Sequence, residues 1–490
     1  MNRFYVGLVI PFFSVGQSSF SSALFLSKLS NDNLPLKHLA EADMIFAKVR
    51  AGSTPVDVQK SLALEKDCVN ICLSTSLILT ILTHYRNDWK SALGVFNWAA
   101  SRPDYKHSKE SYSLMVDILG KMKQMDQMKD LLEDIRKSKL ATLETISKAM
   151  RRYSGAGQWE EAVKLFDSLT DFGLIKNTES MNILLGTLSK EGNIVNARAI
   201  FLQLKDHIPP DAKTFNILIH GWCKINRIEE AEWTIKEMKG YGCNPCVISY
   251  STIISKYCLT SNYSKAIELL DLLESNGCNA NTITYTTMMS IMAKHGQFDE
   301  ALKLANRMKK LGSVPDTLFY NVLIFTLGKS GRTNEAIEVF WTEMLNEGVL
   351  PNTSTYNTMI SIYCQVGDEE SALDLLEKME CVGGCKPDNL SYFPLFKFCF
   401  RTGKVDSLLM KLLDDMKNKH RVSLDESAYM LLIHGFCRVN RSHLAYDLFE
   451  ELIRKDMKPK NQTCRVLLDA VRLKKMYRAV EKIESVIKRL

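Results

Sequence analysis

Apolar residues recur at helical spacing in paired segments along most of the chain. In residues 353–366 they fall on one face of a helix: Tyr356, Met359, Ile360, Tyr363 and Cys364. Glycine at residue 367 interrupts this pattern, and a second apolar stripe follows: Ala372, Leu375, Leu376 and Met379. Glycine after a helix with proline beyond it is a helix stop signal, and Gly384 and Pro387 close this segment. The pattern predicts two helices joined by a tight turn.

This helix pair is repeated with a period close to 35 residues. An alanine marks the same place in the second helix of nine pairs: Ala92, Ala162, Ala197, Ala231, Ala266, Ala301, Ala336, Ala372 and Ala445. A pair this short cannot bury its apolar faces alone, whereas stacked pairs bury a continuous core. The sequence therefore predicts an all-α fold, a right-handed α-solenoid superhelix of about 11–12 helix-turn-helix repeats.

The period divides the chain into three parts. Residues 1–40 are predicted to be a transit peptide and disordered lead, residues 41–72 an N-terminal helical segment, and residues 73–490 the repeat array. The predicted repeats begin at residues 73, 109, 143, 178, 212, 247, 282, 317, 353, 389, 426 and 461. The repeats that begin at 353 and 389 exceed the period by one and two residues, which we expect late in the second helix or in the turn.

The first thirty residues differ in composition from the rest. They contain seven serines, and no acidic residue occurs before Asp32, which is typical of an organellar transit peptide. The apolar run from Phe4 to Phe13 also resembles the core of a secretory signal peptide. Thirteen cysteines without a compact cluster favour a reducing compartment over secretion.

Overall composition is that of a soluble folded protein, with 46% hydrophobic and 24% charged residues. No apolar run of about 18 residues is present, so no membrane association is predicted. The net charge of +7 permits an anionic partner without demonstrating one.

The period also accounts for residues that would otherwise suggest a metal site. Cys243 and Cys246 form a C-x-x-C pair, but Cys243 shares its place after the turn glycine with Cys278 and Cys385. No second pair or nearby histidine completes a zinc site. Deaminase, zinc-protease and phosphate-loop motifs are missing from the sequence. The sequence therefore predicts no metal, no cofactor, no small-molecule substrate and no enzymatic activity.

A small polar residue follows the aromatic or apolar fourth residue of most repeats. These fifth residues are Ser147, Asn182, Asn216, Ser251, Thr286, Asn321 and Asn357. Neighbours on a helix point about 100° apart, so if the fourth residue is in the core, the fifth faces elsewhere. Asparagine and threonine each cost roughly 0.5 kcal/mol in helix propensity, and Lys, Glu or Gln would suit a solvated face better. Repetition of this cost favours a function for the face.

The segments "AKTFNILIHGWCKINRIEEAEWTIKEMKGYGCNPC" and "TITYTTMMSIMAKHGQFDEALKLANRMKKLGSVPD" resemble the pentatricopeptide repeat family, in its P-class, plant organellar type. The tetratricopeptide signature W-x-x-L-G-x-x-Y is missing. The resemblance implies sequence-specific binding of single-stranded organellar RNA, one base per repeat, running 5′ to 3′ from the N to the C terminus. It implies a role in transcript stabilisation, processing, splicing or translation, with other RNA-processing proteins as further partners. The expected location is the mitochondrion, with the chloroplast as the alternative.

The resemblance further implies that the fifth and last residues of a repeat select its base. It assigns Ser147 with Asn177 to adenine, Asn182 with Asp211 to uracil, Asn216 with Cys246 to a pyrimidine, Ser251 with Asn281 to adenine, Thr286 with Asp316 to guanine, Asn321 with Asn352 to cytosine, and Asn357 with Asp388 to uracil. The predicted core is 5′-AUYAGCU-3′. Ser113 with Thr142 is ambiguous. Outside the core the fifth residues do not fit: Leu77, Phe393, Met430 and Arg465.

Two further sets of residues follow from the resemblance. Second residues that wedge beside the base are Ile248, Ile283 and Leu318, whereas Glu144, Glu179 and Lys213 depart from this pattern. Thirteenth residues expected to contact phosphate are Lys121, Lys190, Lys224, Lys294, Lys329, Arg401 and Arg438. These cations also complement the helix dipole, and the two interpretations are compatible. The alternative function is a protein-binding α-solenoid scaffold, which hydrophobic fifth and last residues would favour.

Overall fold

The computed structural model describes residues 36–49, 54–278, 280–381 and 384–488. Residues 1–35, on which the transit-peptide prediction mainly falls, lie outside the described residues. The chain forms two compact units, Met1–Asn244 and Pro245–Leu490. The described residues contain helices and turns and no strand, which confirms the predicted all-α solenoid of helix pairs. None of the described helices has the length and apolar character needed to cross a membrane.

The first compact unit begins with three helices outside the regular pairs. These are α2 (Leu36–Val49), α3 (Pro55–Leu64) and α4 (Lys66–Val69), so helical structure starts before the predicted boundary at residue 41. The pairs that follow are α5 (Thr75–His84) with α6 (Trp89–Ala100), α7 (Lys109–Lys121) with α8 (Met125–Ser138), α9 (Leu143–Gly155) with α10 (Trp159–Asp167), α11 (Thr178–Lys190) with α12 (Ile194–Leu204), and α13 (Ala212–Lys224) with α14 (Ile228–Gly240). A short 3₁₀ turn, η1 (Leu169–Phe172), follows α10.

The second compact unit contains seven repeats. They comprise α15 (Val247–Leu259) with α16 (Tyr263–Ser275), α17 (Thr282–Lys294) with α18 (Phe298–Lys310), α19 (Thr317–Lys329) with α20 (Thr333–Glu338), η2 (Val339–Glu343) and α21 (Met344–Asn346), α22 (Thr353–Val366) with α23 (Glu369–Cys381), α24 (Asn389–Thr402) with η3 (Val405–Leu409), α25 (Met410–Asp414) and η4 (Asp415–Lys419), α26 (Glu426–Arg438) with α27 (Ser442–Arg454), and α28 (Asn461–Leu473) with α29 (Tyr477–Ile487).

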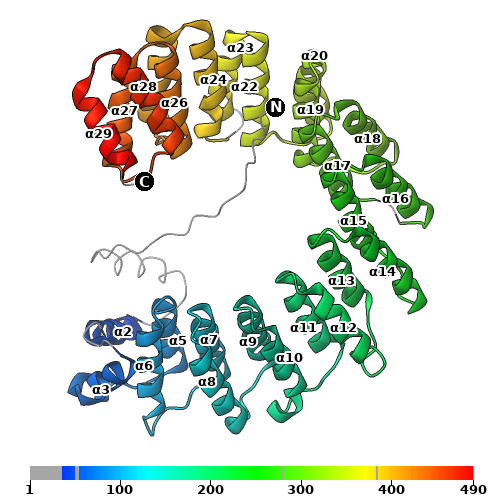
Figure 1. The fold of residues 1–490 in the computed structure, drawn as a ribbon, viewed down its shortest axis with the longest axis vertical. Coiled ribbons are helices and arrows are strands. Elements are labelled where there is room, and N and C mark those ends of the chain that lie inside the picture. Colours follow the sequence, from blue (N-terminus) through cyan, green and yellow to red (C-terminus); the bar gives the residue numbers. More distant parts are fainter. Residues whose placement is uncertain (1–35, 50–53, 279, 382–383, 489–490) are drawn as a thin grey trace. The chain divides into compact units, whose positions relative to one another are not determined.

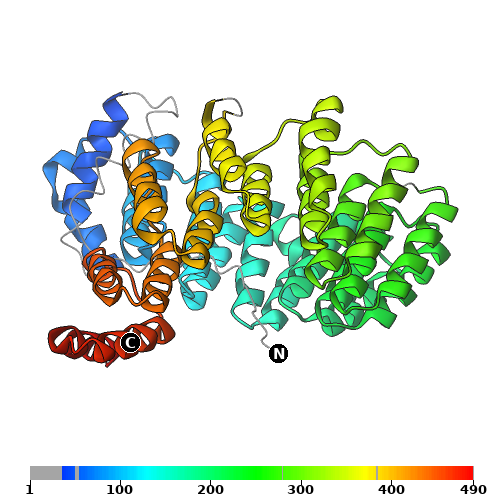
Figure 2. The same cartoon turned by 90° about the horizontal axis from the view of Figure 1, so that it is seen from above.

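Within each compact unit the helices form two layers. The first helix of one repeat packs on the first helix of the next, as α7 does on α9 and α22 on α24. The second helix packs on its own partner and on the first helix of the following repeat, as α18 does on α17 and α19. Figures 1 and 2 both show the green helices of residues 247–329 standing side by side. The first helices therefore present one continuous layer in each unit.

The fourth residues of the repeats form the centre of the core. They are at most 6% exposed at Phe215, Tyr250, Tyr285, Tyr320, Tyr356, Tyr392 and Tyr429. The marker alanines of the second helices are fully buried beside them, which lets the helices approach closely. Cys223, Cys258 and Cys364 are also buried, and burial raises the pKa of the Cys258 thiol to about 12. The aromatic fourth residues are thus packing positions, as the apolar periodicity predicts, and these three cysteines are packing residues too.

Extra residues of two long repeats are absorbed by turns of π-helix. The repeat 317–352 is one residue longer than the repeat 282–316, a feature that the sequence analysis overlooked, and its second helix contains the π turn η2. The repeat 389–425 is two residues longer and contains two π turns, η3 and η4. A π turn accommodates one additional residue without breaking the helix. One of these turns, η3, lies at the start of the second helix rather than at its end, where the extra residues were expected.

Gly94 on α6 marks a close approach between α6 and α3. A Cβ atom there would lie 2.5 Å from Val58 Cβ and 2.8 Å from the backbone oxygen of Pro55 on α3. We expect Gly94→Val to lower the free energy of unfolding by about 1–3 kcal/mol, because α3 and α6 must separate. Urea denaturation measures this. Gly155→Val, where a Cβ meets nothing within 4 Å, is the control, and equal midpoints for the two variants would contradict the packing argument.

Candidate functional site

The last residue of each repeat is the N-cap of the first helix of the next repeat. Asp388 accepts a hydrogen bond from the backbone N–H of Ser391 at 3.0 Å and so caps α24. The same capping bond is made by Thr142, Asn177, Asp211, Asn281, Asp316, Asn352 and Asp425. The first N–H groups of a helix have no partner within the helix, and Asn, Asp, Ser and Thr side chains satisfy them. This capping role explains the Asn, Asp and Thr residues at the last position, to which Cys246 and Lys460 are exceptions.

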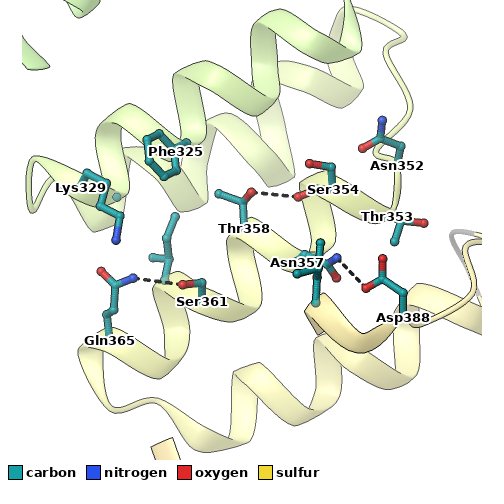
Figure 3. A pocket seen from close by; sticks show the side chains of 13 residues that line it. Phe325, Lys329, Asn352, Thr353, Ser354, Asn357, Thr358, Ser361, Gln365 and Asp388 are labelled. Carbon is teal, nitrogen blue, oxygen red and sulfur yellow. Dashed lines mark hydrogen bonds between the residues drawn. The ribbon is translucent and has the colours of Figure 1, made fainter. Parts of the chain in front are cut away.

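Asn357 joins this cap from the preceding repeat. Its Nδ2 donates to Oδ1 of Asp388 at 3.0 Å, and its Oδ1 accepts from the Ser391 hydroxyl at 2.6 Å. Figure 3 shows the Asn357 and Asp388 side chains directed toward one another from α22 and the start of α24. Two hydrogen bonds therefore fix the orientation of the Asn357 amide.

The same three-residue cluster occurs twice more. Asn182 donates to Asp211 at 3.0 Å and accepts from the Thr214 hydroxyl at 2.7 Å. Asn321 donates to Asn352 at 3.2 Å, and the Thr355 hydroxyl donates to its Oδ1 at 2.5 Å. The hydroxyl in each cluster belongs to the third residue of the next repeat, a position that the sequence analysis missed. Three of the predicted residue pairs are thus brought into hydrogen-bond contact.

The capping hydrogen bond determines which side-chain atom of the last residue is left to bind a group outside the cluster. Backbone N–H groups only donate, so the capping side chain must turn an oxygen toward the helix. All the hydrogen bonds to Asp388 and Asn352 go to Oδ1. Within the described residues, Oδ2 of Asp388 and Nδ2 of Asn352 take part in no hydrogen bond. An aspartate at this place therefore offers an acceptor, whereas an asparagine offers a donor.

Asp211 shows the electrostatic effect of the cluster. Burial alone would raise the pKa of its carboxyl, but hydrogen bonds from Asn182 and Thr214 outweigh this and hold the pKa below its usual range. The carboxylate is therefore charged at neutral pH and acts only as an acceptor. Its partner Asn182 is 4% exposed, which makes it the least accessible asparagine among the three clusters.

The serine and threonine pairs are arranged differently. Among the described residues, no hydrogen bond joins Ser147 to Asn177, Ser251 to Asn281, or Thr286 to Asp316. Ser251 Oγ donates instead to the carbonyl of Ile248 at 3.3 Å. These side chains are shorter than asparagine and leave space beside the cap.

Two of the predicted positions differ from the rest. The Thr286 hydroxyl is buried, at 2% exposure, without a hydrogen-bond partner among the described residues. The third residue of the following repeat is the apolar Phe319, so no hydroxyl is present there to complete a cluster. Asn216 lies on α13 and Cys246 precedes α15, in different compact units, so that pair stays a prediction.

A groove opens beside Asn357 and Asp388. Its volume is about 630 Å³, and Ser354, Leu390 and Lys329 line it together with these two residues. Leu390 is the second residue of its repeat and is 59% exposed. The predicted wedge residues Ile248, Ile283 and Leu318 are similarly exposed apolar side chains. Leu390 was missed because its repeat has an unsuitable fifth residue, although its apolar character at the second position was a usable signal.

The predicted phosphate-contacting cations are all exposed. Lys224 and Arg401 donate to backbone carbonyls of the preceding repeat, those of Lys190 and Cys364. This is the helix-dipole role noted above. Lys121 donates to Oδ1 of Asn87 at 2.6 Å, and Lys329 lies over the ring of Phe325 while lining the groove. Lys190, Lys294 and Arg438 complete the series.

Within residues 36–49, 54–278, 280–381 and 384–488, no group of three or more His, Cys, Asp or Glu side chains is placed to hold an ion.

Profiles of known families match much of the chain. The PPR repeat family profile matches residues 210–259, 245–294, 280–318, 315–364, 351–401 and 424–472, and a PPR repeat profile matches residues 110–140 and 149–174. The chain is 53% identical over 432 residues to a mitochondrial pentatricopeptide repeat-containing protein of Arabidopsis thaliana, covering 88% of this chain and 85% of that protein. A second such mitochondrial protein of Arabidopsis thaliana is 45% identical over 467 residues, covering 94% and 82%.

A solved structure shows the same fold. The crystal structure of the pentatricopeptide repeat protein PPR10 in complex with an 18-nt psaJ RNA element matches with a TM-score of 0.56. The match has 18% sequence identity and covers 96% of this chain and 78% of that one.

Proposed function

Since this chain belongs to the pentatricopeptide repeat family, we propose that it binds single-stranded RNA in a sequence-specific way, one base per repeat, without catalysing a reaction. The observation that carries this proposal is the recurrence of the asparagine, cap and hydroxyl cluster in three repeats. Each cluster holds two polar side chains in a fixed orientation at the edge of the first-helix layer. The fold match to an RNA-bound relative adds support.

The free atom of the cap gives a physical basis for choosing between pyrimidines. Uracil carries an N3–H donor, and an aspartate such as Asp388 offers the acceptor that it needs. Cytosine carries an N3 acceptor, and Asn352 offers the matching donor. We therefore assign uracil to Asn357 with Asp388 and to Asn182 with Asp211, and cytosine to Asn321 with Asn352.

Side-chain length gives a basis for choosing purines. Ser147, Ser251 and Thr286 are shorter than asparagine and leave more room for a larger base. We therefore assign adenine to the two serine positions and guanine to Thr286. With a pyrimidine at Asn216, the proposed core is 5′-AUYAGCU-3′.

The proposed mechanism is passive. Exposed apolar second residues such as Leu318 and Leu390 flank the bases in the second compact unit, and exposed cations beside them attract the phosphates. A protein bound in this way covers a short RNA segment, so it blocks exonucleases or prevents base pairing within the RNA. We propose that this act stabilises a transcript or directs its processing, splicing or translation.

We propose the mitochondrion as the location. The two relatives described above are mitochondrial proteins, and the serine-rich first thirty residues lack acidic side chains. The alternative is the chloroplast. Import of the full chain into isolated mitochondria and chloroplasts would distinguish the two locations.

Binding of synthetic RNA tests the proposed function. We expect an RNA containing 5′-AUCAGCU-3′ to bind at least about tenfold more tightly than a scrambled RNA of equal composition, because each mismatched base costs about 1–3 kcal/mol. Fluorescence anisotropy at one fixed salt concentration measures both Kd values. The same core placed in a hairpin stem is the control and should bind weakly, since its base edges are paired. Equal affinity for core and scrambled RNA would contradict base selection.

A further inference from the structure

A basic pocket lies between the first helices of three consecutive repeats in the first compact unit. It has a volume of about 370 Å³, and α7, α9 and α11 line it. Its cationic lining residues are Lys121, Lys123, Lys148, Arg151, Arg152 and Lys190, and its carboxylates are Asp117 and Glu191. Only Lys121 and Lys190 belong to the predicted phosphate-contacting series, so most of this positive charge has no assigned role.

Ion pairs neutralise only part of this charge. Arg152 pairs with Asp117 at 2.8 Å, and Lys148 pairs with Glu144 at 2.8 Å. Arg151 donates from Nε to the carbonyl of Ser147 at 3.4 Å, and no carboxylate among the described residues pairs with it or with Lys190. The pocket therefore retains an excess of positive charge, and a bound anion would reduce the repulsion among its cations.

The pocket occupies a gap in the thirteenth-position series. That position is Lys121 on α7 and Lys190 on α11, but on α9 it is Gly155. A Cβ atom at Gly155 would meet nothing within 4 Å, so the space beside it is open. Arg151 lies one helical turn before Gly155 and lines the same pocket. Its charge thus replaces the missing cation of the series.

The neighbouring second residues are acidic rather than apolar. Glu110, Glu144 and Glu179 occupy the positions that Ile248, Ile283 and Leu318 occupy in the second compact unit. Exposed carboxylates do not stack against a base, so the repeats at the pocket lack the apolar wedges found further along the chain. At these repeats the cations of the pocket, rather than apolar wedges, are the groups that can attract the RNA.

We propose that this pocket binds a phosphate group at the 5′ side of the RNA, where the first base-selecting repeat, with Ser147, begins. The inference rests on the proposed function and its strand direction. Such a phosphate belongs either to the continuing backbone or to a 5′-terminal phosphomonoester, which carries more negative charge. Arg151, which pairs with no carboxylate among the described residues, is the principal cation that holds it, and Lys148 lies in the same pocket.

The test uses the full chain with Lys148→Gln and Arg151→Gln combined, and Lys137→Gln on α8, an exposed lysine outside the pocket, as the matched control. One probe is 5′-AUCAGCU-3′ with a short oligo-A extension on its 5′ side. The other probe begins at the first core base and carries either a 5′-hydroxyl or a 5′-monophosphate. Kd is measured across a salt series, together with the thermal midpoint of each variant.

For a backbone phosphate, we expect the double variant to weaken the extended RNA and its scrambled counterpart equally. The salt slope should fall by about 0.7 for each phosphate that the variant no longer neutralises. For a terminal phosphate, we expect weaker binding only with the 5′-monophosphate probe. Arg151→Lys should keep the wild-type slope, which separates a charge effect from a folding defect.

Two outcomes would overturn the pocket assignment. The first is a double variant that binds every probe with the wild-type Kd and the wild-type salt slope. The second is a double variant with a changed base preference. Failure of the wild-type chain to prefer the core RNA would instead contradict the proposed function.

Discussion

The Asp388→Asn variant is expected to prefer cytosine instead of uracil at the last base of the core. Oδ1 still accepts from the N–H of Ser391 and from Asn357, but the atom at the Oδ2 position becomes an N–H donor. The N3–H of uracil then meets a donor, whereas the N3 acceptor of cytosine finds its partner. The pair Asn321 with Asn352 already has this arrangement. Helix stability should change by only a few tenths of a kcal/mol, since asparagine and aspartate cap equally well.

The expected size of this effect is large because both bases respond. A matched set of hydrogen bonds to a base edge contributes about 1–3 kcal/mol of discrimination. The wild-type chain should therefore bind the RNA that ends in U more tightly, and the variant the RNA that ends in C. Each 1.4 kcal/mol of discrimination corresponds to about a tenfold ratio of the two Kd values. Competition binding with core RNAs that end in U or C measures it. Asp425→Asn is the matched control, because Asp425 caps α26 in the same way but is the last residue of a repeat whose fifth residue is Phe393. An unchanged uracil preference in Asp388→Asn would contradict the role of the free cap atom.

The Ser251→Asn variant is expected to prefer cytosine instead of adenine at the fourth base. Asn281 caps α17, and Thr284, the third residue of that repeat, supplies a hydroxyl, so an asparagine at 251 has both partners of the Asn321 cluster. The longer side chain also fills the space that serine leaves for a purine. Binding to core RNAs that carry A or C at this base measures the change, with an expected discrimination of about 1–3 kcal/mol.

Thr286→Asn provides an informative comparison for that variant. Asp316 is the last residue of the same repeat, so an asparagine at 286 would form an Asn–Asp pair, which we assign to uracil in place of guanine. Phe319, the third residue of the next repeat, offers no hydroxyl to orient the new amide. We therefore expect a smaller gain for the new base than in Ser251→Asn. If the two variants change preference equally, the hydroxyl of the third residue has no part in orienting the fifth.

Features that depend on local sequence were well predicted. The first helices begin at residues 109, 143, 178, 212, 247, 282, 317, 353, 389, 426 and 461, because capping residues and apolar periodicity act over a few neighbouring positions. Only the first repeat differs, since α5 begins at Thr75 after the N-cap Ser74. The burial of Tyr356 and its equivalents follows from the same periodicity.

Features that depend on several repeats were not predicted. The hydroxyl of Ser391 reaches Asn357 across a repeat boundary, and the resemblance names only the two residues of a pair. Arg151 lines the basic pocket together with Lys121 and Lys190, which lie on two other helices, so the sequence of one repeat does not reveal the pocket. The π turn in residues 339–343 arises from one surplus residue that a strict period conceals.

The last residue of a repeat caps the next helix and, in our proposal, also selects a base. These two roles together bear on how binding specificity changes over evolutionary time. Asparagine and aspartate stabilise the helix start almost equally, whereas alanine there costs about 1 kcal/mol. Codons for these two residues differ by a single nucleotide. If the cap residue selects the base as proposed, a repeat of this chain can exchange one pyrimidine for the other in one mutational step without passing through an unstable intermediate. Under this proposal, helix capping limits the substitutions by which such an array can change its RNA target without losing stability.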